Sequence, residues 1–224
     1  IKCDWSSDVC SSDLTHADQG GGWTETQRQA FYTTDQGSEM IPLKWMKALK
    51  TDSGEEFLHD QLARYGYLPN PENTNGLPVG FTVGGSAENP IAGMNCAACH
   101  TREIRIEGTD YRIDGGPALV DFQSFLTDQV AAVGRVLAND AAFKPFADAV
   151  LGANADANAR FALHEAVALW HTRELAMVTH AIPQKDMWGL GRLDAVSMIF
   201  NRLAGLDIGP APTHLIVGNI KPAN

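Results

Sequence analysis

The stretch GMNCAACHT, residues 93–101, holds two cysteines separated by two residues, with a histidine directly after the second. In one helical turn this spacing brings Cys96 and Cys99 to a separation at which both thiols can add to the vinyl groups of a porphyrin. His100 then faces the metal and binds iron through one imidazole nitrogen, while a hydrogen bond from the other nitrogen fixes the ring. This order of residues is typical of a c-type haem site, so we expect one covalent haem c with iron ligated by His100.

Two other chemistries use a pair of cysteines at this spacing. A thioredoxin-like redox pair needs a βαβ context, which the mainly helical pattern around the motif does not predict. Half of a zinc site needs two more ligands at metal spacing. His164 and His171 lie seven residues apart on one expected helix, about 10 Å along its axis, which is too far for one ion.

The composition is that of a globular protein, with 44% hydrophobic and 20% charged residues and a formal net charge of −10. No basic cluster offers a surface for nucleic acid, and no apolar run is long enough to predict a membrane-spanning helix. The segment DWSSDVCSSDL, residues 4–14, resembles a translated sequencing adapter, so we set residues 1–14 apart as an artefact and treat 15–224 as the domain. Cys3 and Cys10 fall in the excluded part, and a four-cysteine disulfide framework is then not expected.

Hydrophobic periodicity predicts a mainly α fold with long irregular loops and one small β-hairpin. Together with the C-x-x-C-H motif, this indicates a cytochrome c-like haem domain. The stretch from Gly66 to Gly93 is rich in proline and glycine and is expected to form no regular element. EIRIEGTDYRI, residues 103–113, predicts the hairpin, with Ile104, Ile106, Tyr111 and Ile113 on one face. Helices are expected at Thr24 to Thr33, Pro42 to Leu49, Gly54 to Tyr65, from Pro117 onward, Ala141 to Leu151, Asn158 to Thr179 and Leu193 to Leu203.

A haem must be enclosed by apolar side chains, and its propionates need cationic partners. Tryptophans and nine phenylalanines supply the apolar part, although each one taken singly fits an ordinary core equally well. Arg102, Arg112 and Arg192 are candidates for the propionates, with a solvated surface arginine as the alternative for each. Acid–base helpers could be Asp114, Glu165 and Asp194, but charged residues at helix starts are more often caps.

The iron face opposite His100 decides between two functions. A methionine or histidine there makes an electron carrier, whereas an open position admits oxygen or peroxide. Met94 is held on the same side as His100, so a sixth ligand would come from a distant segment. The sequence offers seven such residues: His164, His171, Met177, His180, Met187, Met198 and His214.

A series of blocks carries a family resemblance. These blocks are FYTTDQGSEMIP (31–42), RYGYLPNP (64–71), NGLPVGF (75–81), NCAACHT (95–101), YRIDGGPALVDFQSFL (111–126), WGLGRLDA (188–195) and IFN (199–201). In this order they resemble the di-haem cytochrome c peroxidase-like proteins, and within them the rubber-oxygenase-like branch. The resemblance extends from about Trp23 to the end, but this chain has a single C-x-x-C-H where two are expected in the complete protein.

The resemblance implies the N-terminal haem half of a larger, periplasmic or secreted di-haem oxidoreductase that acts on peroxide or dioxygen. His100 would be the proximal ligand, and Trp188 and Phe200 would line the distal pocket. The expected partners are the small oxidant or a redox protein, and the missing second haem domain. The alternative is an electron-transfer module whose sixth position is closed and which binds no substrate.

Overall fold

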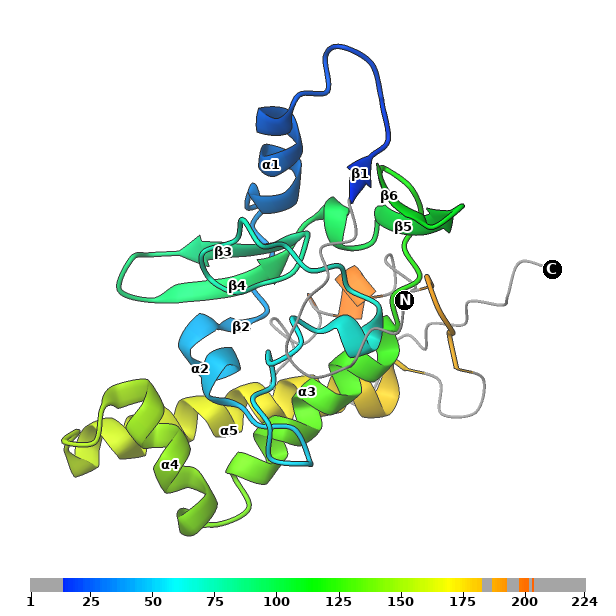
Figure 1. Ribbon diagram of the computed structural model, residues 1–224. Helices are drawn as coiled ribbons and strands as arrows, with labels where there is room; N and C mark the ends of the chain where they lie inside the picture. Colours follow the sequence, from blue (N-terminus) through cyan, green and yellow to red (C-terminus); the bar gives the residue numbers. More distant parts are fainter. Residues whose placement is uncertain (1–13, 183–186, 193–197, 202, 204–224) are drawn as a thin grey trace.

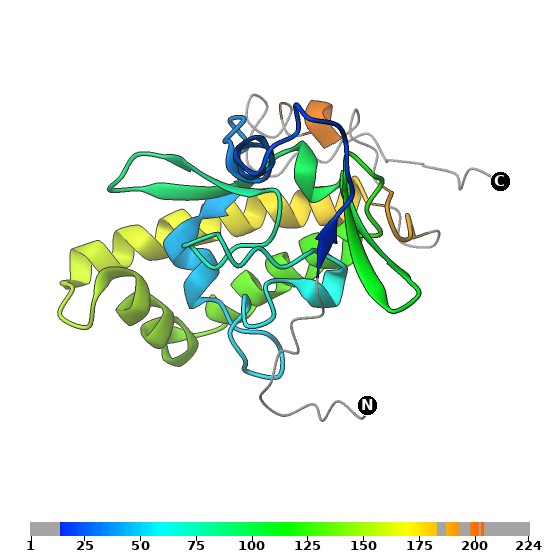
Figure 2. The same cartoon turned by 45° about the horizontal axis from the view of Figure 1, so that its top comes forward.

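The computed structural model describes residues 14–182, 187–192, 198–201 and 203. Its strands form two three-stranded sheets, in the order β1-β6-β5 and β2-β4-β3. Helices α1 and α2 contact the second sheet, and α3, α4 and α5 pack against one another (Figures 1 and 2). The strands are β1 (Thr15–His16), β2 (Ile41–Pro42), β3 (Phe81–Gly85), β4 (Pro90–Met94), β5 (Thr101–Ile106) and β6 (Thr109–Asp114). The α-helices are α1 (Glu25–Thr33), α2 (Leu43–Ala48), α3 (Phe122–Val136), α4 (Asp140–Leu151) and α5 (Ala157–His180).

The predicted fold class is wrong. The two sheets make this a mixed α and β architecture, and not a mainly α, cytochrome c-like domain with one hairpin. The error comes from the proline- and glycine-rich stretch 66–93, which contains β3 and β4. Gly84 and Gly85 end β3, Pro90 begins β4, and the antiparallel register pairs Phe81 with Met94. These residues interrupt a periodic pattern, but they are tolerated at strand ends.

The second hairpin, β5–β6, is confirmed. Glu107 and Gly108 form its two-residue turn with φ of 51° and 88°, as hairpin turns that match the strand twist require. The side chains that this hairpin buries differ from those predicted. The buried side chains are Thr101, Arg112 and Asp114, whereas the predicted apolar face is partly exposed, with Ile106 at 51%. The buried side chains of this hairpin are therefore polar or charged.

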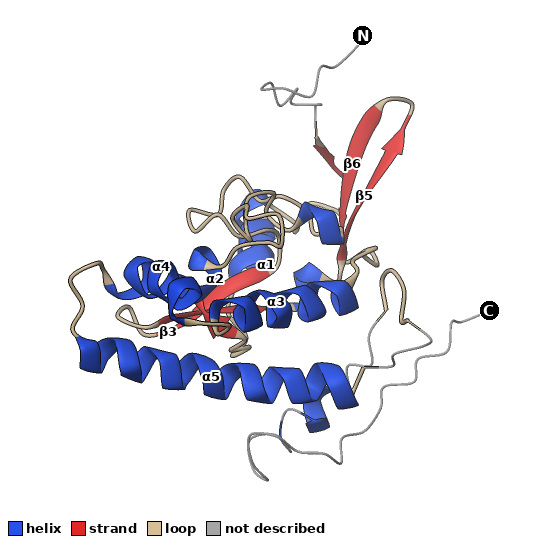
Figure 3. Ribbon diagram, turned by 90° about the horizontal axis from the view of Figure 1, so that it is seen from below, coloured by secondary structure: helices blue, strands red, loops and turns tan. Residues whose placement is uncertain are grey.

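Most predicted helices are present, and α1, α3, α4 and α5 each begin at a side chain that caps the first turn, whereas α2 begins after Pro42 without such a cap. Thr24 and Gln27 form a capping box on α1, and Asp121 and Asp156 accept the free backbone N–H groups of α3 and α5. Figure 3 shows α5 as the longest helix, running alongside α3. The expected helix from Leu193 to Leu203 falls partly outside the described residues, of which 198–201 are helical.

The helix predicted over Gly54 to Tyr65 is wrong. This segment consists of turns and ends in a single 3₁₀ turn, Ala63–Tyr65. Gln61 and Leu62 have φ of 48° and 62°, in the left-handed region, which an α-helix cannot contain. The Asp60 carboxylate stabilises this turn by accepting the backbone N–H groups of Leu62 and Arg64, each at 2.9 Å.

The core is an aromatic cluster on α3. Phe125 is fully buried and lies at its centre, close to four rings from two other segments. The ring centroids of Tyr67, Tyr65 and Phe81 lie 5.5, 5.7 and 5.7 Å from it, mostly edge to face. Such pairs add stability beyond the burial of area. The cluster joins β3, the 57–67 segment and α3 into one body.

Candidate functional site

The C-x-x-C-H motif forms a single turn between the two sheets. It follows β4 and is a 3₁₀ turn, Cys96–Ala98, capped by the side chain of Asn95. The backbone N–H of His100 donates to the carbonyl of Cys96 at 2.9 Å, which closes the turn. The helical turn expected for the motif is confirmed in this short form.

Two residues that the sequence analysis did not single out fix this turn. Gly80 has φ of 76°, and a Cβ atom on it would overlap the backbone nitrogen of Ala98. The Asn95 amide donates to the carbonyls of Phe31 and Thr34, at 3.0 Å each, at the end of α1. Because neither contact involves a side chain of Cys96, Cys99 or His100, the motif is held in place independently of its reactive side chains.

The three chemically active side chains of the motif are accessible. Cys96 and His100 are exposed, Cys99 is half-buried, and neither cysteine is in a disulfide. Burial, and then the neighbouring Cys96 thiol, raises the pKa of the Cys99 thiol. A redox-active cysteine needs the opposite shift, and the flanking strands β4 and β5 belong to antiparallel pairings, not to a βαβ unit.

Buried polar atoms without a partner lie close to the motif. Tyr67 is 2% exposed, its hydroxyl has no hydrogen-bond partner, and its pKa is raised well above the ordinary value by burial and then by Cys99. The Thr101 hydroxyl, next to His100 in the chain, is likewise buried and unpartnered. Buried polar groups normally have partners, so these two point to a further group that belongs at this place.

Exposed apolar side chains border the motif on the other side. The backbone N–H of Ala118 donates to the Cys99 carbonyl at 3.0 Å, and that of Gly191 to the Val120 carbonyl at 2.8 Å. The first bond joins the segment that contains Leu119 to the motif, and the second joins the segment that contains Leu190 to that of Leu119. Leu119 is 48% exposed and Leu190 is 58% exposed. Two thiols, an imidazole, unpartnered hydroxyls and this apolar rim are a set that fits a covalent haem.

No group of three or more metal-binding side chains was found among the residues that the structure describes. The motif itself would give iron one ligand, His100, because its thiols bond to carbon and not to metal. A zinc site would need four ligands from the protein. The described part of the chain does not assemble these around Cys96 and Cys99.

The predicted pocket residues have different surroundings. Trp188 is buried and stacks on Phe122, with ring centroids 6.5 Å apart and an angle of 6° between the planes, whereas Phe200 is 56% exposed. Arg112 is buried and donates to Glu103 at 2.5 Å and to the Pro69 carbonyl at 3.1 Å. Its guanidinium therefore already has a carboxylate partner. Arg192 and Arg102 are half-buried.

Among the candidate sixth ligands that the structure describes, Met187 is tied to a segment near the motif. Its sulfur accepts a hydrogen bond from the Gln123 amide at 3.0 Å, at the start of α3, and Met187 is 57% exposed. Met177 is buried, and His164 lies edge-on to Phe143 with ring centroids 5.0 Å apart. Burial lowers the pKa of the half-buried His171. His180 is exposed, Met198 is half-buried, Met94 is half-buried in β4, and His214 lies outside the described residues.

The two acid–base candidates that the structure describes, Asp114 and Glu165, lie on different elements and do not form one site. Asp114 is buried and accepts hydrogen bonds from Trp23 at 2.7 Å, Arg28 at 3.0 Å and Tyr32 at 2.5 Å, so it serves to tie α1 to β6. Glu165 lies on α5 beside His164, 3.6 Å away. Asp194 lies outside the described residues.

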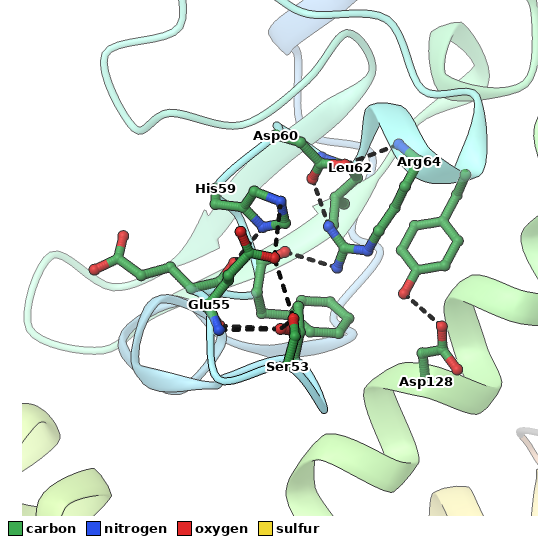
Figure 4. Close-up of polar contacts among 11 residues, drawn as sticks. Ser53, Glu55, His59, Asp60, Leu62, Arg64 and Asp128 are labelled. Atoms are coloured by element: carbon green, nitrogen blue, oxygen red, sulfur yellow. Dashed lines mark hydrogen bonds and ion pairs between the residues drawn. The ribbon is translucent and has the colours of Figure 1, made fainter. Parts of the chain in front are cut away.

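A second polar site, which the sequence analysis missed, lies between the 51–65 segment and α3. It is a pocket of about 340 Å³. Figure 4 shows Glu55, His59, Asp60 and Arg64 on one side and Asp128 of α3 on the other. The guanidinium of Arg64 pairs with Asp60 and lies 4.8 Å from the ring centroid of Phe57. The sequence analysis assigned most of these charged residues to one predicted helix, Gly54 to Tyr65, and so did not predict that they line one pocket with Asp128.

Comparison with known proteins gives one informative similarity. A Sinorhizobium fredii protein described as "Uncharacterized protein y4iJ" is 32% identical over 213 residues, which cover 83% of this chain. The matched region is 35% of that protein, so the chain spans about a third of the length of this relative. No family model matches the chain, and no solved structure matches it. No helix among the described residues is long and apolar enough to cross a bilayer.

Proposed function

We propose that this chain binds haem c covalently and is the N-terminal haem part of a larger, periplasmic or secreted di-haem oxidoreductase that acts on peroxide or dioxygen. The observation that supports it most is the Cys96–His100 turn, fixed by backbone contacts and with its thiols and imidazole accessible. The greater length of the Sinorhizobium fredii relative supports a further domain.

The chain's own residues divide the work of binding. Cys96 and Cys99 would hold the porphyrin through thioethers, and His100 would bind the iron. Tyr67 would donate its hydroxyl proton to the bound group, because the residues that the structure describes offer that hydroxyl no acceptor. Leu119 and Leu190 would exclude water from one face. The haem, when bound, supplies the redox chemistry.

Absorption spectra of the matured protein test this proposal. The chain is expressed with an export signal and haem-attachment machinery, and spectra are recorded before and after adding cyanide or hydrogen peroxide. A Soret band that shifts with either ligand is expected, because an open iron face binds it. His100→Ala should change the spectrum of the unliganded protein, while His59→Ala, in the pocket of Figure 4, should not. An unchanged spectrum in His100→Ala would refute the ligand assignment.

The second candidate is an electron-transfer module, and the position of Met187 favours it. This exposed thioether lies in the segment that Gln123 and Val120 tie to the start of α3, next to the motif. If Met187 closes the sixth position, the spectrum should ignore added cyanide, and Met187→Ala should make it responsive. If Met187→Ala leaves an open iron unchanged, the oxidoreductase proposal is favoured.

A further inference from the structure

The tyrosine at the wall of the pocket in Figure 4 has the surroundings of a redox-active residue. Tyr65 donates its hydroxyl proton to the Asp128 carboxylate at 2.8 Å, and both residues line the pocket. The guanidinium of Arg64 lies 4.5 Å from the ring centroid of Tyr65. Burial and the bond to Asp128 raise the pKa of Tyr65 to about 12, so this phenol keeps its proton at neutral pH.

Two short routes connect Tyr65 to the haem attachment turn. In the first, Tyr67 is near enough to Cys99 for the thiol to raise the Tyr67 pKa, and the ring of Phe125 bridges Tyr67 and Tyr65, with centroid separations of 5.5 and 5.7 Å. In the second, the backbone from Ala118 to Asp121 bonds at one end to the Cys99 carbonyl, at 3.0 Å, and at the other to the Tyr65 carbonyl, at 2.8 Å. Closely spaced π systems and hydrogen-bonded backbone are the usual media for electron transfer in proteins.

The charges around Tyr65 determine how it could be oxidised. A cation over an aromatic ring is attracted to its π electrons, so Arg64 disfavours a positively charged ring. The electron can leave only together with the phenol proton. The Asp128 oxygen, 2.8 Å from the hydroxyl, is placed to accept this proton. The pair therefore favours a neutral tyrosyl radical and a neutral carboxylic acid.

We propose that Tyr65 is a redox-active residue that donates an electron to the haem site and is reduced again by a small neutral donor, of the phenol or hydroquinone class, in the adjoining pocket. This inference rests on the proposed function. Hydrogen peroxide is the oxidant: it takes up two electrons and two solvent protons and leaves as two water molecules. Tyr65 supplies one electron and passes its phenol proton to Asp128, and a bound haem would supply the other electron. A donor hydroxyl then gives one hydrogen atom to the Tyr65 radical and leaves as a donor radical, while Asp128 releases its added proton to solvent. A second donor molecule, which loses its hydroxyl proton to solvent, would return the other electron.

The pocket suits such a donor. Its volume of about 340 Å³ is sufficient for a single aromatic ring with polar substituents. Its acidic side chains, Asp52, Glu55, Asp60 and Asp128, outnumber its two arginines, so a neutral donor is preferred over an anionic one.

Freeze-quench electron paramagnetic resonance on the haem-loaded protein tests the radical. After addition of hydrogen peroxide, we expect a tyrosyl signal that narrows when the tyrosines carry deuterated rings. Tyr65→Phe should lose this signal, Asp128→Asn should reduce its yield several-fold, and Tyr111→Phe, in the β5–β6 hairpin, should keep it. An unchanged signal in Tyr65→Phe, or no tyrosyl signal from a protein with a normal Soret band, would overturn the inference. A protein without a Soret band would instead overturn the proposed function, and the inference with it.

Decay of the radical with hydroquinone tests the pocket. Ser53 lines the pocket, so Ser53→Trp should fill it and slow the decay several-fold. Ser86→Trp, on the exposed loop between β3 and β4, should leave the decay unchanged. Equal decay rates in wild type and Ser53→Trp would show that the donor acts elsewhere and would overturn the assignment of the pocket.

Discussion

The surroundings of Asp114 and those of the Cys96–His100 turn both contain buried polar groups, but these groups are satisfied in the first region and unsatisfied in the second. Asp114 is 6% exposed, and Trp23, Arg28 and Tyr32 all donate to its carboxylate. Around the turn, in contrast, the Tyr67 and Thr101 hydroxyls are buried without a partner and the thiols remain free. A polar group satisfied within the chain indicates a structural role, and an unsatisfied one indicates that something outside the chain belongs there.

The largest effect should come from breaking the satisfied region. Asp114→Ala leaves the buried Arg28 guanidinium with the exposed Glu25 in place of its buried carboxylate partner, and removes the acceptor of Tyr32 and Trp23. Loss of one partner of a buried ion pair costs about 3–5 kcal/mol. Urea unfolding should show a loss of that size.

The matched control for Asp114→Ala is Asp110→Ala on the same strand. Asp110 pairs with Arg105, whose side chain is 66% exposed, and such surface pairs contribute about 0–1 kcal/mol. Equal losses in the two variants would show that the Asp114 cluster is not structural.

The next largest loss of stability is expected at Gly80, whose backbone packs against the Cys96–Ala98 turn. An alanine at a position with positive φ costs about 1–2 kcal/mol. Gly108→Ala, at φ of 88° with open space around it, should lose only this amount. Gly80→Ala, at φ of 76°, should lose clearly more, because its Cβ would also overlap Ala98. Urea unfolding of both variants measures the difference, and equal losses would mean that Gly80 does not support the motif.

Two tyrosines allow the two regions to be compared by the removal of one hydroxyl from each. Tyr32→Phe removes a hydrogen bond to a charged carboxylate and should cost about 1.5–3 kcal/mol. Tyr67→Phe removes a buried hydroxyl that has no partner, so the haem-free protein should be equally stable or more stable. A loss in Tyr67→Phe as large as that in Tyr32→Phe would contradict the difference between the two regions.

The smallest effect is a pH dependence. Burial, and then the charges of Arg28 and Arg112, lower the pKa of His16 from its ordinary value of 6.5. Between 6.5 and the lower folded value, the unfolded chain binds the proton more readily, so the free energy of unfolding falls as pH falls through this window. Burial alone also lowers the pKa of His171.

Urea unfolding across this pH window measures the contribution of His16. His16→Asn should make the pH profile flatter, and adding His171→Asn should flatten it further. An unchanged slope in His16→Asn would show that its charge is not coupled to the Arg28 and Arg112 pair.

The sequence was sufficient to predict those helices and turns that local signals determine. α1, α4 and α5 begin at residues whose side chains cap helices, and the β5–β6 turn uses a glycine where a positive φ is needed. It was insufficient where distant segments decide. Pro90 and Gly84 are typical of loops. They nevertheless belong to strands β4 and β3, which pair with each other, and β4 also pairs with β2.

The candidate site divides in the same way. Cys96, Cys99 and His100 could be recognised from spacing alone, because the chemistry of attachment is local. Gly80 and Tyr67 could not, since their roles depend on a backbone and a thiol that are distant in sequence. The predicted role of Arg112 overlooked Glu103 across the hairpin, which already pairs with its guanidinium.

The central claim is that Cys96 and Cys99 hold a haem, and intact-mass spectrometry of the matured protein tests it most directly. The account predicts a mass increase of one haem that survives denaturation and organic extraction. The increase should be absent in the double variant Cys96→Ser/Cys99→Ser and present in His59→Ala. A matured wild-type protein with no added mass, or a double variant that retains it, would contradict the account.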